Sequence, residues 1–118
     1  MHLIHSPTQT TLLTHLRRCD SFLCRLRGLM FRRALAPGEG LLFIYPRDSI
    51  LDSSIHMFFM AFPIAAVWLN NEQIVVDAQL AQPWRPYYAA RQPARYIIEA
   101  APDLLNRITI GDTLTWLD

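Results

Sequence analysis

The chain has 118 residues, of which 52% are hydrophobic and 18% are charged, and its formal net charge is +1. This size and composition predict one globular domain, residues 1–118, and exclude a disordered chain. Because the charges nearly balance and the arginines are interleaved with apolar residues, strong attraction to nucleic acid or to anionic lipid is not expected. We therefore predict neither nucleic acid nor a membrane as a partner.

The longest apolar stretch, residues 53–69, is the expected centre of the core. His56 and Pro63 interrupt it, whereas a membrane-spanning helix needs roughly 20 unbroken apolar residues. The first residues lack the positive and apolar regions of a secretory signal. We expect a mature chain in the cytoplasm.

Two cysteines, Cys19 and Cys24, are five positions apart. This spacing is neither the C-x-x-C redox motif nor half of a zinc site. On one helix the two side chains would point away from each other, so we predict two reduced thiols, with a redox pair as the alternative.

In chain order, the first expected elements are a strand and a helix. Threonines and leucines in residues 10–16 predict a short strand, and Asp20 and Ser21 are both suitable N-caps for a helix that follows. Gly28 marks the end of that helix or a close backbone contact. Apolar residues at spacings of three and four form one stripe on it: Phe22, Leu23, Leu26, Leu29 and Met30.

The middle of the chain predicts extended structure. A turn at residues 37–40 precedes a buried strand at residues 41–45, and residues 46–54 form a polar loop. Aromatic and β-branched residues favour strands on both sides of Pro63. Asn70 and Asn71 tolerate the left-handed conformation of a hairpin turn.

The last part of the chain predicts more short elements. Residues 74–80 form the return strand of the hairpin, and the proline- and aromatic-rich residues 81–95 should lie across the sheet. Residues 96–100 predict another strand, residues 102–105 one helical turn, and residues 108–117 two strands separated by a turn or bulge. Six or seven short strands with one or two short helices indicate a mainly β barrel or sandwich.

Three motifs occur in a fixed order: R-L-R-G-L-M-F-R at residues 25–32, I-H-M-F-F-M-A-F-P-I at residues 55–64, and P-W-R at residues 83–85. In content and order they resemble the domain of unknown function 192 family, also called uncharacterised protein family 0127. A glycine-rich turn is matched by residues 38–40, and the resemblance covers about residues 16–114. It implies a mostly β fold and no agreed activity.

The chain departs from the family pattern at two places. Ala65 stands where the pattern has an aspartate after Pro-Ile, and the pattern's Leu-Pro-Ala-Gly after its glutamate is not kept after Glu99. If that aspartate were a catalytic acid or base, this chain would be inactive. If it were a buried hydrogen-bond acceptor, its loss would require only local repacking.

His56 is the first candidate for chemistry, as a base, a ligand or a pH switch. The alternative is a half-buried histidine bonded to a backbone carbonyl or to Asp52. On a strand, His56 and Met60 would share a face and could bind copper(I), but methionines in an apolar run usually fill the core. We predict no metal and no cofactor.

Arginines are the second group of candidates. Arg25 and Arg32, with Arg85 beside Trp84, could form a pocket for an anion or carboxylate. The alternative is a salt bridge from Arg25 or Arg32 to Glu39, Glu99 or Asp112, which would join the helix to the sheet. The sequence contains no nucleophile elbow and no arranged cysteine and histidine pair.

These patterns favour a non-enzymatic module that binds a small ligand or another protein. The candidate ligand-binding residues are Arg25, Arg32, His56, Met60, Trp84, Arg85 and Glu99. The alternative is a hydrolase-type enzyme that uses His56 with a nearby serine or carboxylate, and that Ala65 would inactivate. Exposed apolar surface on the aromatic segment also predicts weak self-association.

Overall fold

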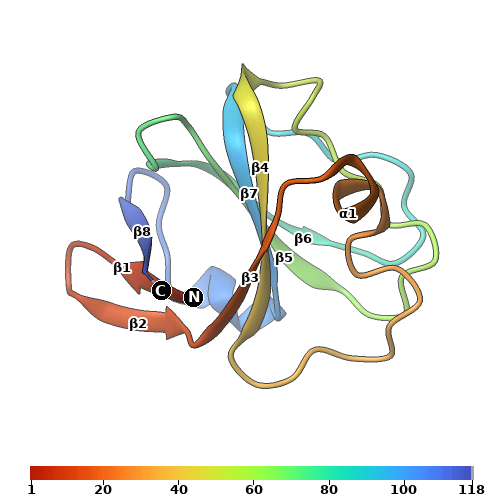
Figure 1. Cartoon of the computed structure of the whole chain (residues 1–118), viewed down its shortest axis with the longest axis horizontal. Coiled ribbons are helices and arrows are strands. Elements are labelled where there is room, and N and C mark those ends of the chain that lie inside the picture. Colours follow the sequence, from red (N-terminus) through yellow and green to blue (C-terminus); the bar gives the residue numbers. More distant parts are fainter. Residues whose placement is uncertain (118) are drawn as a thin grey trace.

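The computed structural model describes residues 1–117 and shows a mainly β molecule, as the sequence predicts (Figure 1). A five-stranded sheet has the order β3-β4-β7-β5-β6, and a three-stranded sheet has the order β2-β1-β8. The described elements are β1 (His2–His5), β2 (Thr10–Leu13), β3 (His15–Cys19), α1 (Phe22–Arg27), β4 (Glu39–Ser49), β5 (Ile64–Leu69), β6 (Val75–Ala81), β7 (Ala94–Ala100), the 3-10 helix η1 (Pro102–Asn106) and β8 (Leu114–Leu117).

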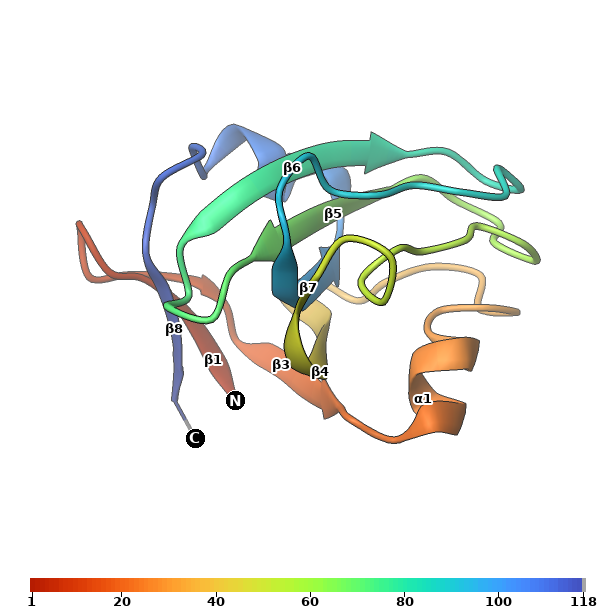
Figure 2. The same cartoon turned by 90° about the horizontal axis from the view of Figure 1, so that it is seen from above.

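Both faces of the large sheet are covered, and β5 shows this most directly. All six of its residues are buried. Ala65, Val67 and Leu69 point into one apolar core, which the small sheet and η1 complete. The alternate residues, including Trp68, point into a second core, which lies beneath α1 and the long loops. Figure 2 shows the small sheet at one end and α1 with these loops at the other.

Local signals set the bounds of α1 as expected. The Ser21 hydroxyl accepts a hydrogen bond of 3.1 Å from the Cys24 amide, which is the N-cap contact. Gly28 ends the helix with a φ of 49°, and a Cβ on it would lie 3.4 Å from the Phe43 ring. The chain therefore needs glycine there because it turns left-handed against the sheet.

The prediction of strands on both sides of Pro63 is wrong for the first side. Residues 53–62 are irregular, with one isolated bridge from Ile55 to Tyr88. Met57 and Met60 are buried in the second core, while Phe58 and Phe59 between them are exposed. This burial does not alternate from one residue to the next, so the segment forms turns rather than a strand.

Other bounds also shift. β4 continues through residues predicted as loop, because Ser49 still pairs with Ala94 across a bulge. Residues 108–112 form no strand, and β1 was not predicted. In the β5–β6 hairpin the left-handed residue is Gln73, with φ 64°, while the Asn70 side chain accepts hydrogen bonds from the amides that follow it. The helical turn predicted at residues 102–105 is confirmed as η1.

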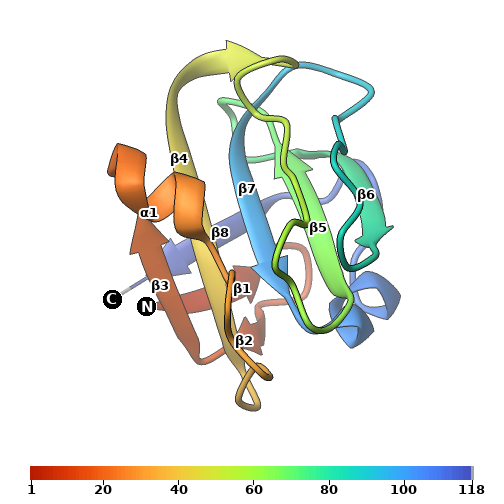
Figure 3. The same ribbon diagram turned by 90° about the vertical axis from the view of Figure 1, so that its right-hand side faces the viewer.

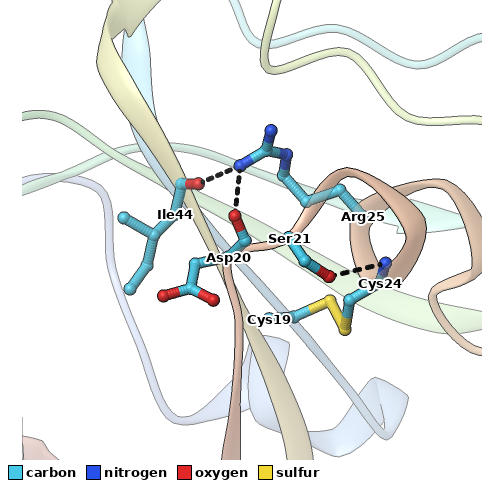
Figure 4. Close-up of a disulfide and its surroundings, with 6 residues drawn as sticks. All are labelled: Cys19, Asp20, Ser21, Cys24, Arg25 and Ile44. Atoms are coloured by element: carbon cyan, nitrogen blue, oxygen red, sulfur yellow. Dashed lines mark hydrogen bonds between the residues drawn. A yellow bond between two sulfur atoms is a disulfide. The ribbon is translucent and has the colours of Figure 1, made fainter.

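The prediction of two reduced thiols is also wrong, because Cys19 and Cys24 form a disulfide (Figure 4). Cys19 ends β3, and Cys24 lies in the first turn of α1. The chain bends between these elements, which brings the two Cα atoms to 5.5 Å, so the argument from a single helix does not apply. No helix within residues 1–117 is long and apolar enough to cross a membrane.

Candidate functional site

Glu99 lies at the centre of the candidate site. It is on β7, with Leu41 of β4 and Ala66 of β5 as its register partners, so it projects from the middle strand of the sheet into the second core. The residue is only 5% exposed. Its carboxyl has no hydrogen bond or ion pair within residues 1–117, and its oxygens remain accessible only through a small pocket.

Burial raises the pKa of Glu99 to about 8, and no nearby charge contributes to the shift. The carboxyl is therefore mostly protonated at neutral pH, although a solvated glutamate would be ionised. An uncompensated buried acid of this kind is unusual in proteins, where buried polar groups have partners.

The pocket has a volume of about 50 Å³ and lies between α1, β4, β7 and residues 54–60. Figure 3 shows α1 in front of β3 and β4 on this face of the sheet. Of the predicted ligand-binding residues, the pocket brings together Arg25, His56, Met60 and Glu99. A space of this size holds only a few heavy atoms.

Arg25 fastens α1 to the edge of the pocket. Its Nη1 donates hydrogen bonds to the carbonyl oxygens of Asp20, at 2.8 Å, and Ile44, at 2.9 Å (Figure 4). The guanidinium also lies 5.2 Å from the centre of the Tyr45 ring. Arg25 makes no salt bridge with an acidic residue within residues 1–117, so its predicted ion pair is not found.

Tyr45 lines the pocket and was not among the predicted residues. Burial, together with the nearby Glu99 carboxyl, raises the pKa of its phenol to about 12, so it is a neutral hydrogen-bonding group. The alternation of side chains along β4 could have identified Tyr45 from the sequence, because Leu41, Phe43 and Tyr45 share the face on which Glu99 lies.

His56 and Met60 come from the irregular segment, not from a strand. The Phe58 amide donates a 3.2 Å hydrogen bond to His56 Nδ1, so a neutral ring carries its proton on Nε2. The partner is thus a backbone amide and not the backbone carbonyl or Asp52 that the sequence suggested. Met60 is buried in the wall of the pocket. Within residues 1–117 no three His, Cys, Asp or Glu side chains are grouped to hold a metal ion.

Arg32 lies outside the pocket. Its guanidinium forms a two-bond ion pair with Glu39, with Nη2 donating to Oε1 at 2.8 Å. This hydrogen-bonded pair holds the pKa of Glu39 down at about 2. The salt-bridge reading of Arg32 is confirmed. It joins the loop after α1 to the start of β4.

Trp84 and Arg85 also lie outside the pocket. Trp84 is exposed and packs against Phe59, with ring centres 5.0 Å apart, and the Arg85 guanidinium lies 4.9 Å from the centre of the Tyr88 ring. Their backbones hold the pocket segment in place, because the Met57 amide donates to the Arg85 carbonyl at 2.8 Å. They support the segment that carries His56 without contacting the pocket.

Ala65 lies on the opposite face of the sheet from Glu99. Its side chain is fully buried in the first core, and its register partner on β7 is Ala100. An aspartate at this position would point away from the pocket and from His56, because successive side chains of a strand point to opposite faces.

Comparisons with known proteins agree with this fold. The profile of the domain of unknown function 192 family, described as uncharacterized ACR, matches residues 4–116. The UPF0127 protein of Thermococcus gammatolerans is 36% identical over 104 residues, covering 86% of this chain and 66% of that protein. A UPF0127 protein of Pyrococcus furiosus is 35% identical over 102 residues, covering 85% and 84%. The crystal structure of a proposed transcription regulator from Sinorhizobium meliloti superposes with a TM-score of 0.83 at 24% identity, covering 97% of this chain and 89% of that one.

Proposed function

The chain belongs to the domain of unknown function 192 family, whose activity is unknown, and we propose that it is a non-enzymatic module that binds a small ligand in the Glu99 pocket. One observation carries the proposal: Glu99 is a largely buried carboxyl that opens into a pocket and makes no hydrogen bond or ion pair within residues 1–117. Such a group is costly to bury unless something pairs with it.

Glu99 is the one acid among the described residues that line the pocket, beside Arg25 and Arg27, and its ionised carboxyl would pair with a small ammonium group. Burial alone raises the pKa of Glu99, so Arg25 does not act as its counter-ion. The other predicted arginines, Arg32 and Arg85, are engaged elsewhere. The walls include the rings of Phe43 and Tyr45, whose faces attract cations, and the volume admits only the end of a molecule.

Binding of an ammonium group requires Glu99 to lose its proton. Affinity should therefore rise about tenfold per pH unit from pH 5 to pH 7 and level off above the pKa of the carboxyl. We would titrate the protein with ethylammonium chloride and follow the backbone amides of β7 and residues 54–60 by NMR. Glu99→Gln should abolish the binding, and Glu72→Gln, a change at an exposed position, should leave it unchanged.

Three results would contradict the proposal. Absence of binding at about pH 9, where the carboxyl is ionised, or equal binding by Glu99→Gln, would remove the pocket as a site. Binding of acetate in place of ethylammonium would keep the pocket and reverse the charge of its ligand.

Two observations weigh against the hydrolase alternative as the sequence suggested it. Ala65 lies across the sheet from His56, so restoring an aspartate there would not supply an acid or base to that histidine. The Ser54 hydroxyl, the nearest serine in sequence, donates to the Leu51 carbonyl at 2.8 Å. Binding of a protein partner and the cytoplasmic location both stay predictions. The disulfide argues against a cytoplasmic location, because such bonds persist mainly in oxidising compartments.

A further inference from the structure

The charge of the chain is unevenly distributed along the sequence. Residues 17–33 contain six of the 11 basic residues and one acid, Asp20, and so carry a net charge of +5, which leaves −4 for all other residues. The near-neutral total therefore hides a basic segment. In the fold this segment comprises the end of β3, α1 and the loop after it.

The apolar side of α1 faces solvent. Phe22 is 72% exposed, Leu23 74% and Leu26 52%, and no residue of α1 is buried. A surface helix normally turns its apolar stripe to the core. Here the stripe predicted from the sequence is divided, because only Leu29, beyond the end of the helix, is fully buried.

Three aromatic side chains extend from neighbouring loops. Phe31 stacks on Phe59 with ring centres 4.9 Å apart, and Trp84 packs at a tilt against Phe59 with ring centres 5.0 Å apart. Each of the three is between 47% and 67% exposed. All three have a left-handed backbone, with φ values of 66°, 59° and 68°. This conformation is unfavourable for bulky residues, and residues held in it cluster at functional sites in proteins.

These two apolar groups lie at the same end of the molecule. The views agree that α1 and the loops near residues 31, 59 and 84 lie far from the two termini and from β1 and β8 (Figures 1 and 2). The Phe31 amide donates a 3.0 Å hydrogen bond to the Phe59 carbonyl, which ties the first two loops together. We call this region, formed by α1 and the three aromatic loops, the α1 end.

A hollow at the α1 end gathers positive charge beside the apolar side chains. It has a volume of about 550 Å³, and Arg17, Arg27, Arg32 and Leu23 line it with Glu39. Glu39 already pairs with Arg32. The hollow therefore keeps a net positive charge that suits a phosphate group.

We propose that the α1 end docks onto an anionic membrane surface, with Phe22, Leu23 and the aromatic loops inserted at the headgroup boundary and a lipid phosphate in the arginine hollow. Exposed apolar side chains beside a hollow lined with arginines are complementary to such a surface in both polarity and charge. The proposal departs from the expectation of no membrane partner, which was based on the near balance of charges and on the interleaving of the arginines with apolar residues. It is independent of the Glu99 pocket.

The other occupants fit this region less well. A second copy of the chain would bring two strongly basic segments together, which like-charge repulsion disfavours. Nucleic acid would satisfy the arginines but not the aliphatic side chains of Leu23 and Leu26. The aromatic rings also cover one another, so fewer of their faces are open to bases.

Flotation of the purified chain with lipid vesicles tests the proposal. It should float with vesicles of phosphatidylcholine mixed with phosphatidylglycerol, and floating should weaken with phosphatidylcholine alone and at high salt. The double variant Phe22→Ser with Leu23→Ser should bind at least tenfold more weakly. Its control is Ile110→Ser, a change to an exposed apolar residue outside the α1 end.

Charge is tested in the same way. Arg27→Gln should weaken vesicle binding roughly fivefold, whereas Arg47→Gln, which removes an exposed arginine of β4, should have a smaller effect. Circular dichroism would show that the variants remain folded. Equal flotation by the Phe22 and Leu23 variant and the parent would overturn the proposal. So would failure to float with any vesicle, tighter binding to an oligonucleotide, or a dimer in light scattering that this variant disperses.

Discussion

The two faces of the five-stranded sheet are covered in different ways. One face lies under β1, β2, β8 and η1, and its core is apolar throughout. The other lies under a six-residue helix and three long loops, and it contains the disulfide, two buried carboxyls and the left-handed aromatic residues. The regular face provides stability, whereas the irregular face has the features that proteins use for binding.

The two buried carboxyls make the contrast sharper, because they share the irregular face. Asp77 accepts hydrogen bonds from the amides of Ala78 and Arg91 and from the Gln79 side chain, at 2.8, 3.1 and 2.9 Å. Glu99 has no such partner within residues 1–117, and its carboxyl opens into the pocket instead. Asp77 is therefore a structural carboxyl that holds a loop, and Glu99 is the one that we propose pairs with a ligand.

The largest expected effect is on the regular face. Ala65→Asp would place a carboxylate among apolar side chains and should lower the free energy of unfolding by about 4 kcal/mol. Urea denaturation would measure the loss, with Ala61→Asp as the control because Ala61 is exposed. A loss below about 1 kcal/mol would show that this face tolerates a buried charge, and the two faces of the sheet would then not differ as described.

Glu99 should make stability depend on pH. Because its pKa rises from 4.5 to about 8 on folding, the folded state binds the extra proton between these values. Stability should thus fall by a few kcal/mol as pH rises through this window and stay level above it. Glu99→Gln should remove that slope and exceed the parent in stability at about pH 9. Denaturation at several pH values would check this, and an unchanged slope in the variant would place its origin in another group.

Asp77, in contrast to Glu99, should stabilise the folded protein through its hydrogen bonds. Asp77→Ala removes the acceptor of the Ala78 and Arg91 amides and one of the two acceptors of the Gln79 side-chain amide, so we expect a loss of about 2 to 3 kcal/mol at neutral pH. Asp48→Ala, at an exposed position, is the matched control. If Asp77→Ala unfolds no more easily than this control, the two carboxyls do not differ as described.

The disulfide should have a smaller effect, and it concerns α1. Closing such a short loop stabilises a chain by about 2 kcal/mol. Reductant should lower the unfolding midpoint of the parent protein and have no effect on a variant with Cys19→Ser and Cys24→Ser. Mass spectrometry of the alkylated protein would report the bond directly. If both thiols are alkylated without prior reduction, the cysteines are reduced, as the sequence predicted, and the disulfide is absent.

Local sequence signals determined much of the framework. The cap at Ser21, the end of α1 at Gly28 and the β5–β6 hairpin each depend on residues close together in the chain. The three motifs identified the family for the same reason, since they are short and occur in a fixed order. Four of the seven predicted ligand-binding residues line one pocket.

Only the tertiary structure decided which of these residues meet and which face each occupies. Glu99 is unpartnered because Leu41 and Ala66, far away in sequence, flank it across the sheet. Ala65 is remote from the pocket although it is near His56 in the chain, because one step along a strand reverses the face. Burial, disulfide pairing and the exposure of α1 depend on these long-range contacts, which a pattern of neighbouring residues does not encode.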